Sequence, residues 1–370
     1  MTWESSVVIL LVGSLVAASC ALLGSFLVLR RSVLLGDALS HSALPGIAIA
    51  FFLTESLSSW PMVLGAGAFG VLTVYLVEAL TRSRRLREDA SIGVVFPALF
   101  ALGVILVSRH ARQVHLDMDC VLFGEITWVP FDLLIVGEHS LGPKGLWVAA
   151  VVLLVDVAVV ALFYKELKVT TFDPELAASL GISPTLVHYI LMSAVSLTLV
   201  AAFEAVGAIL VVALLVVPPA TAYLLTERLW LMLSLAIGLG VLAACGGYAV
   251  AGALDCSIAG AIASVAGGFF VLALLFAPRG GMVAWLLSHR RLRQELSGQL
   301  LLLHLQGGES SVDLDRVAER FAWGQAELAQ VLRPLEERRW VERTGRQLRL
   351  TPAGEESLKA LGTAPLAHRG

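Results

Sequence analysis

Long apolar stretches recur along the first three quarters of the chain, and each is long enough to cross a bilayer as a helix. A spanning helix needs about 20 apolar residues to cover the roughly 30 Å hydrocarbon core. We place nine spans, near residues 7–29, 36–54, 61–80, 91–108, 146–164, 186–203, 205–224, 230–252 and 257–277. The sixth and seventh are nearly continuous, so one interrupted helix is the alternative, and it lowers the count to eight.

Composition agrees with this placement, because 58% of the residues are hydrophobic, 15% are charged and the mean hydropathy is +0.84. A soluble globular protein is less apolar than this. The first stretch is too long for the core of a signal peptide and follows no basic segment, so we expect it to be retained as a helix. The chain is therefore expected to be a polytopic membrane protein.

The distribution of Lys and Arg predicts the orientation, because short loops rich in these residues stay in the cytoplasm. Alternate loops are basic, and the loops between them carry acidic residues. We expect an N-terminus outside, nine crossings of the cytoplasmic (inner) membrane and a C-terminal domain in the cytoplasm; the eight-helix count breaks this alternation. The basic residues are Arg30, Arg31, Arg82, Arg84, Arg85, Arg87, Lys165, Lys168 and Arg228, and the acidic ones are Glu55, Asp117, Asp119 and Asp255.

The composition changes from about residue 288 onward, where charges of both signs become dense and apolar residues adopt the spacing of soluble helices. We expect helices over 292–306, 312–321 and 326–339, a strand pair around Thr344 and Gly345, and a last helix ending at Leu361. The predicted fold class is an all-α polytopic membrane protein followed by a small winged-helix domain. We divide the chain into a transmembrane domain (1–285), a cytoplasmic winged helix-turn-helix domain (290–362) and a flexible tail (363–370).

Two ionisable residues, Asp37 and His41, lie at the start of the second span, inside an otherwise apolar stretch. Residues four apart leave one face of a helix, so the two side chains can share one cation. A carboxylate beside an imidazole suits Mn, Fe or Zn better than Ca or Mg. Charged groups are costly inside a membrane and mark functional sites. The alternative is that both side chains form hydrogen bonds to neighbouring helices and serve packing.

Five ordered motifs are spread over roughly residues 7–280, namely 36–46 (GDALSHSALPG), 88–93 (EDASIG), 122–124 (LFG), 171–177 (TFDPELA) and 205–222 (AVGAILVVALLVVPPATA). With these motifs the chain resembles the permeases of manganese, zinc and iron ABC importers. The resemblance implies an all-helical permease that forms a homo- or heterodimer around a central path. It also implies an extracellular or periplasmic metal-binding protein and a separate cytoplasmic ABC ATPase as partners, with Asp37 and His41 as transient metal ligands.

Energy must come from a partner, because the chain contains no G-x-x-x-x-G-K-[ST] phosphate loop. We therefore expect a transporter subunit that is not an enzyme, holds no permanent cofactor and uses ATP bound to its partner. Residues 170–184 predict a short helix from Pro174 to Leu180, ended by Gly181. The resemblance implies that this is the coupling helix that docks on the ATPase; an ordinary interfacial helix is the alternative. The expected contacts are Phe172, Asp173, Glu175 and Leu176.

Three further residues are weaker candidates for a gate or path. Glu204 lies between the sixth and seventh spans near the expected outer face, although an interfacial carboxylate is the simpler interpretation. Asp156 in the fifth span is costly there and is expected to pair with a neighbour for structure. Pro218, followed by another proline, is expected to interrupt the seventh span, and such breaks are tolerated beside a water-lined cavity. An outer cluster of His110, His115, Asp117 and Asp119 is expected to be a solvated loop.

The C-terminal stretches 315–321 (DRVAERF), 331–341 (VLRPLEERRWV) and 350–354 (LTPAG) resemble the winged-helix half of diphtheria-toxin-repressor-like metalloregulators. A DNA-reading helix needs exposed basic and hydrogen-bonding groups. The candidate helix, 324–339, offers Gln325, Arg333, Arg338 and Arg339 as nucleic-acid contacts, but glutamates lie among them. We therefore expect a regulatory or assembly module, with DNA as the less favoured partner.

Two other function classes stay open at this point. A membrane-tethered winged-helix transcriptional regulator or sensor needs only one or two helices as an anchor. An ion-coupled secondary transporter would need no ATPase and predicts inverted repeats with several carboxylates in the path. The sequence favours the importer, and it does not choose between Mn, Zn and Fe, because ligand type restricts the metal only loosely.

Overall fold

The computed structural model contains two compact units, residues Met1–Pro278 and Arg279–Gly370, which are described separately. The extents 1–285, 290–362 and 363–370 given above for the domains and tail stay predictions. The structure describes residues 3–54, 59–83, 86–110, 126–136, 139–277, 281–282, 296–306, 312–321 and 323–363.

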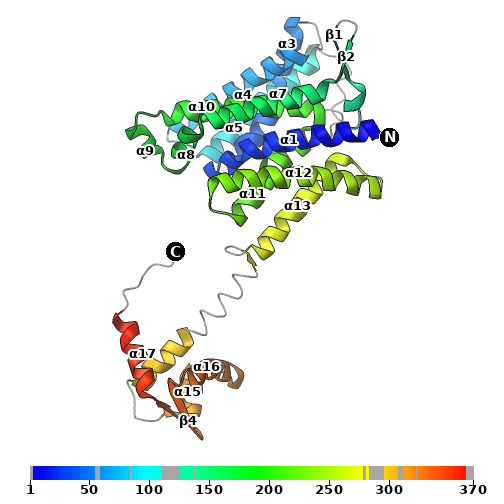
Figure 1. The fold of residues 1–370 in the computed structure, drawn as a ribbon. Helices are drawn as coiled ribbons and strands as arrows, with labels where there is room; N and C mark the ends of the chain where they lie inside the picture. Colours follow the sequence, from blue (N-terminus) through cyan, green and yellow to red (C-terminus); the bar gives the residue numbers. More distant parts are fainter. Residues whose placement is uncertain are drawn as a thin grey trace. The chain divides into compact units, whose positions relative to one another are not determined.

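The first unit is a bundle of long apolar helices (Figure 1). Within the described residues, nine helical spans are long and apolar enough to cross a membrane, which confirms the count of nine. They are formed by α1 (Trp3–Arg30), α2 (Val33–Ser42) with α3 (Leu44–Thr54), α4 (Ser59–Arg82), α5 (Glu88–His110), α7 (Lys144–Leu162), α10 (Pro184–Val206), α11 (Ala208–Leu225), α12 (Leu229–Leu254) and α13 (Ile258–Phe276).

The eight-helix alternative is wrong, because α10 and α11 are separate helices divided at Gly207. Its backbone angles are φ 82° and ψ 155°, a conformation that glycine alone adopts readily. The α10 helix ends with the Gly207 N–H donating to the carbonyl of Phe203 at 3.1 Å. A break of this kind lets the chain reverse direction between two apolar helices with almost no loop.

The second span is interrupted where the sequence predicted one helix. The α2 helix ends at Ser42 and α3 begins at Leu44, with Ala43 between them. Pro45 has no N–H and so cannot donate to the carbonyl of His41, which removes one bond of the helical ladder. The helical hydrogen bonding of this span is therefore interrupted directly after α2, the helix that carries Asp37 and His41.

The expected interruption of the seventh span at Pro218 is absent, since α11 runs through Pro218 and Pro219 as a helix. Pro219 leaves the Leu215 carbonyl without its helical partner. That carbonyl faces Gly24 of α1, where a Cβ atom would overlap with the carbonyl oxygen. The missing side chain on Gly24 therefore makes room for the freed carbonyl, and α11 stays straight enough to remain one helix.

The α1 helix lies inside the bundle and packs against α7, α10, α11 and α12 (Figure 1). Its fully buried side chains include Ile9, Leu23, Phe26 and Leu27. A helix that is apolar on all sides is typical of a buried position. The α1 helix therefore forms the centre of the core of this unit.

The two ends of the bundle differ. Figure 1 shows α8 (Tyr164–Phe172) and α9 (Pro174–Ser179) at the end opposite the N-terminus. Lys165 and Lys168, expected in a loop, lie in α8. Near the N-terminus, the 3-10 turn η1 (Val129–Phe131) precedes an antiparallel hairpin of β1 (Leu133–Val136) and β2 (His139–Pro143), which the sequence did not predict.

The second unit contains a helix over 296–306, then β3 (Val312–Asp313), α15 (Leu314–Phe321), α16 (Gln325–Glu337), β4 (Val341–Thr344), β5 (Gln347–Leu350) and α17 (Pro352–Thr363). Its antiparallel sheet has the order β3-β5-β4. Val312 was expected in a helix, but it lies in β3 and pairs with Leu348. The Asp313 carboxylate accepts a hydrogen bond from the Asp315 N–H at 3.1 Å, which favours a helix that begins after Asp313. The identity of this unit as a winged helix stays a prediction.

Candidate functional site

Asp37 and His41 come together on α2 as their spacing predicts. The His41 Nε2 lies 3.8 Å from the Asp37 Oδ1. The His41 side chain is 36% exposed and the Asp37 side chain is 52% exposed, so the pair lies at the surface of this unit rather than in its core. Within the described residues, no group of three or more His, Cys, Asp and Glu side chains could hold a metal ion.

The opposite face of α2 fixes the direction of the pair. Leu35 and Leu39 on that face are buried in the core. A Cβ atom on Gly36 would lie 2.6 Å from the Leu215 Cδ2, so glycine lets α2 approach α11 closely. Ser42 at the end of α2 accepts a hydrogen bond from the Thr73 hydroxyl of α4 at 2.8 Å. These contacts hold the helix from behind while Asp37 and His41 face outward.

Two aromatic side chains of α5 hold the His41 imidazole, and sequence reasoning missed both. The ring centroid of His41 lies 5.5 Å from that of Phe96 and 6.0 Å from that of Phe100. Aromatic pairs at these separations attract one another in tilted and edge-to-face arrangements. Phe96 and Phe100 are four apart and share one face of α5, which was the signal available in the sequence.

The short helix expected after the fifth span is present as α9. The Asp173 Oδ1 accepts a hydrogen bond from the Leu176 N–H at 2.9 Å and so caps the helix. Phe172 is 60% and Leu176 is 49% exposed, and Glu175 is also exposed. Ala177 is fully buried and anchors the other face. Phe172 at the end of α8 and Leu176 in α9 therefore form an exposed apolar edge, while Asp173 has a structural task that was not predicted from the sequence.

The weaker candidates lie elsewhere. Asp156 is 1% exposed, and the Thr198 hydroxyl lies 2.9 and 3.0 Å from its two carboxylate oxygens, which links α7 to α10. Pro218 is buried inside α11, so the expected helix break no longer supports a role in a path. The Glu204 side chain lies outside the described residues. So do the His110 side chain, residues 115, 117 and 119 of the outer cluster, and the motif at 122–124.

The candidate nucleic-acid contacts of the second unit are exposed on or just after α16, and two of them have partners within the unit. The Arg333 Nε lies 3.1 Å from the Glu337 Oε1. The Arg338 guanidinium carbon lies 4.9 Å from the ring centroid of Trp340. Gln325 is at the start of the helix, and Arg339 has a positive φ of 55° just beyond its end.

Comparison with known proteins places the first unit in a family. The model of the ABC 3 transport family matches residues 4–277. The manganese transport system membrane protein MntD of Bacillus subtilis is 46% identical over 290 residues, which cover 78% of this chain and 98% of that protein. The zinc transport system membrane protein TroD of Treponema pallidum is 46% identical over 352 residues, which cover 94% of this chain and 96% of that protein.

A solved structure supports the same assignment. PsaBC from Streptococcus pneumoniae, determined in complex with Fab, aligns with a TM-score of 0.62 and 29% sequence identity, covering 74% of this chain and 92% of that chain. The family match covers far more than half of the present sequence, and the spanning helices account for the region that it covers. This chain is therefore a multi-pass membrane protein that belongs to the ABC 3 transport family.

Proposed function

We propose that the chain is the membrane-spanning permease subunit of an ABC importer that moves a divalent transition metal across the cytoplasmic membrane. The observation that carries this proposal is the surface-exposed Asp37–His41 pair on α2, in a chain that belongs to a transport family. Similar proteins are named for manganese and zinc transport. A carboxylate and an imidazole are donors that both metals accept, so Mn, Zn and Fe are the candidate cargoes.

The pair is suited to a transient site. One chain supplies two ligands, and a permease dimer with two facing pairs would supply four. Weak and exchangeable ligation fits transport, since an ion must leave as readily as it enters. Phe96 and Phe100 restrain the His41 ring and so reduce the entropy lost when the ion binds.

The driving force would come from a cytoplasmic ABC ATPase that binds α9. The exposed Phe172 and Leu176 form the apolar edge that such a partner would bury. In the proposed orientation the N-terminus is outside, and α8 and α9 face the cytoplasm, as their place at the opposite end of the bundle permits (Figure 1). A periplasmic or extracellular metal-binding protein would deliver the ion at the other face.

The second unit is proposed to be a winged-helix module for regulation or assembly rather than a repressor. The alignment with TroD covers 94% of this chain and so extends into residues 279–370. Because a protein named for transport aligns with part of the second unit, we favour a module of the transporter over a membrane-tethered regulator. The Arg333–Glu337 pair also reduces the positive charge available to phosphates. Sequence-selective, salt-sensitive DNA binding by the whole protein would contradict this assignment.

Metal uptake by living cells tests the proposal. Cells that co-express the chain with its ATPase are given radioactive manganese or zinc, and the wild type is compared with Asp37→Asn and His41→Ala. Asp255→Asn is the control, because it removes an exposed carboxylate at the end of α12 and keeps a side chain that tolerates the φ of 52° there. We expect uptake to be lost in the two α2 variants and kept in the control. Uptake that survives both α2 changes would show that the pair is structural.

A further inference from the structure

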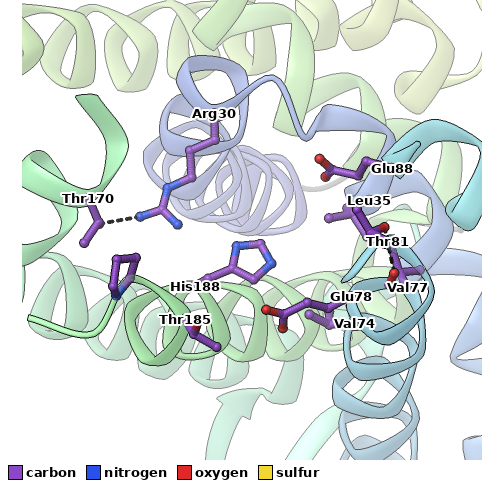
Figure 2. A pocket seen from close by; sticks show the side chains of 11 residues that line it. Arg30, Leu35, Val74, Val77, Glu78, Thr81, Glu88, Thr170, Thr185 and His188 are labelled. Carbon is purple, nitrogen blue, oxygen red and sulfur yellow. Dashed lines mark hydrogen bonds between the residues drawn. The ribbon is translucent and has the colours of Figure 1, made fainter. Parts of the chain in front are cut away.

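A polar cavity of about 300 Å³ lies behind α2, between helices α1, α4, α5, α8 and α10. Figure 2 shows four ionisable side chains around it, namely Arg30, Glu78, Glu88 and His188. Three of them, Arg30, Glu78 and His188, are partly buried between the helices, where ionisable groups are costly and mark candidate functional sites. The Asp37–His41 pair occupies the other face of α2, so the metal site proposed above does not account for these residues.

Arg30 reaches from α1 to α8. It is the last residue of α1, and its guanidinium donates to the Thr171 Oγ1 at 3.1 Å and to the Thr170 Oγ1 at 2.8 Å. Thr170 is buried, and its hydroxyl donates to the Glu166 carbonyl at 2.7 Å, which fixes the acceptor. The planar guanidinium binds two acceptors in one fixed geometry, so it constrains α8 more strongly than a single bond would.

On its other side, Arg30 is joined to α2 by a very short connection. Only Arg31 and Ser32 separate α1 from α2. The Ser32 N–H donates back to the Leu27 carbonyl at 3.0 Å, and the Leu35 N–H donates to the Ser32 carbonyl at 3.1 Å. This tight turn leaves little slack between Arg30 and the helix that carries Asp37. The α8 helix, to which Arg30 is hydrogen-bonded, is in turn separated from α9 by Asp173 alone.

An ordinary interfacial arginine does not explain this arrangement. Such a residue extends its charged end toward the lipid head groups. Arg30 instead points across the cavity to Thr170 (Figure 2). The cavity borders both α8, through Thr170, and α2, through Leu35, so there is open space beside both helices.

We propose that Arg30 transmits movement of α9 to α2, through the Thr170 and Thr171 hydroxyls on one side and the Arg31–Ser32 turn on the other. The inference rests on the proposed function, because it takes α9 as the docking site of the ATPase and α2 as the helix that holds the metal. Arg30 is a positioning residue in this scheme and touches neither metal nor nucleotide. When α8 tilts, the guanidinium moves with it and draws the start of α2 along.

The experiment measures metal ions moved per ATP hydrolysed by the complete complex in proteoliposomes. Thr170→Val with Thr171→Val removes both acceptors and keeps the side-chain shape, and Arg30→Met removes the donor. Arg228→Lys is the control, since Arg228 is an exposed basic residue before α12 that does not line the cavity. Assembly with the ATPase and the rate of ATP hydrolysis are measured on the same samples.

We expect assembled complexes of both test variants to hydrolyse ATP while transporting about fivefold less metal per ATP, the lower range of typical coupling between sites. Arg228→Lys should match the wild type. An unchanged ratio in the threonine double variant overturns the inference, as does a parallel loss of assembly, hydrolysis and transport in that variant. A wild-type complex that moves no metal refutes the proposed function itself, whereas wild-type transport that is lost in Asp37→Asn and kept in the Arg30 and threonine variants refutes only the role of Arg30.

Discussion

Substituting Gly24 by alanine should disrupt the contact between α1 and α11. The added Cβ would lie 2.8 Å from the Leu215 carbonyl carbon and 3.2 Å from the Pro219 Cγ, and it would overlap with the carbonyl oxygen. Carbon atoms in contact prefer about 3.5–4.0 Å, so the two helices must separate by about 0.7 Å or more. The obstacle is backbone on α11, which no rotation of a side chain can move aside.

The expected cost follows from these contacts. Overpacking of a close-packed interior costs about 1–3 kcal/mol, and the rigid backbone obstacle places Gly24→Ala near the upper value. Higher helix propensity of alanine returns about 1 kcal/mol. Gly13→Ala on the same helix is the matched control, because its Cβ would meet Ile126 and Ala244 at 3.6 and 3.8 Å, which are ordinary contacts. The gain in helix propensity is common to both variants and cancels, so their free energies of unfolding should differ by about 3 kcal/mol, the cost of overpacking at Gly24.

Thermal unfolding of the purified protein in detergent measures this difference. The unfolding entropy is about 2.1 cal/mol/K per residue, so each kcal/mol shifts the midpoint of the first unit, Met1–Pro278, by about 1.7 °C, and we expect a gap of about 5 °C. The unfolding of membrane proteins is often irreversible, and midpoints are therefore compared at one heating rate. Equal midpoints for the two variants would refute the argument that Gly24 accommodates the carbonyl freed by Pro219.

Three further predictions concern helix packing, the metal ligands and the ATPase contact. Gly65→Ala should lower the unfolding midpoint, because its Cβ would lie 2.5 Å from the Gly46 carbonyl oxygen, whereas Gly67→Ala on the same helix meets nothing within 4 Å and should not; equal midpoints would contradict this. Phe96→Leu should raise the metal concentration for half-maximal uptake by about tenfold, as a loosened ligand does, with little change at saturation, and an unchanged concentration would show that Phe96 does not position the ring. Leu176→Ser should reduce co-purification of the ATPase, while Ser179→Ala on the same helix should leave it intact; equal recovery would exclude docking through the apolar edge of α9.

The membrane helices could be predicted because their signal is local. An apolar run of sufficient length has few alternatives in a bilayer, and Gly207 marks the division between α10 and α11 within its own neighbourhood. The Pro218 expectation failed for the opposite reason. The carbonyl that Pro219 leaves free packs against Gly24, far away in the sequence, and no pattern within residues 205–222 contains that information.

The candidate site divides in the same way. The juxtaposition of Asp37 and His41 follows from a spacing of four on one helix. Contacts between helices, such as His41 with Phe96 or Arg30 with Thr170, depend on the tertiary arrangement and were not foreseen. The cap formed by Asp173 was visible in the sequence, since an aspartate directly before a helix-starting proline is typical of an N-cap.

Transport by the purified complex tests the central claim most directly. The chain is reconstituted with its ATPase in proteoliposomes, and accumulation of manganese and zinc is followed with ATP, without ATP and with Asp37→Asn in place of the wild type. The account predicts accumulation that requires both ATP and the Asp37 carboxylate. Accumulation without ATP or without the ATPase would indicate an ion-coupled secondary transporter, and no accumulation of either metal under any condition would contradict the proposed cargo.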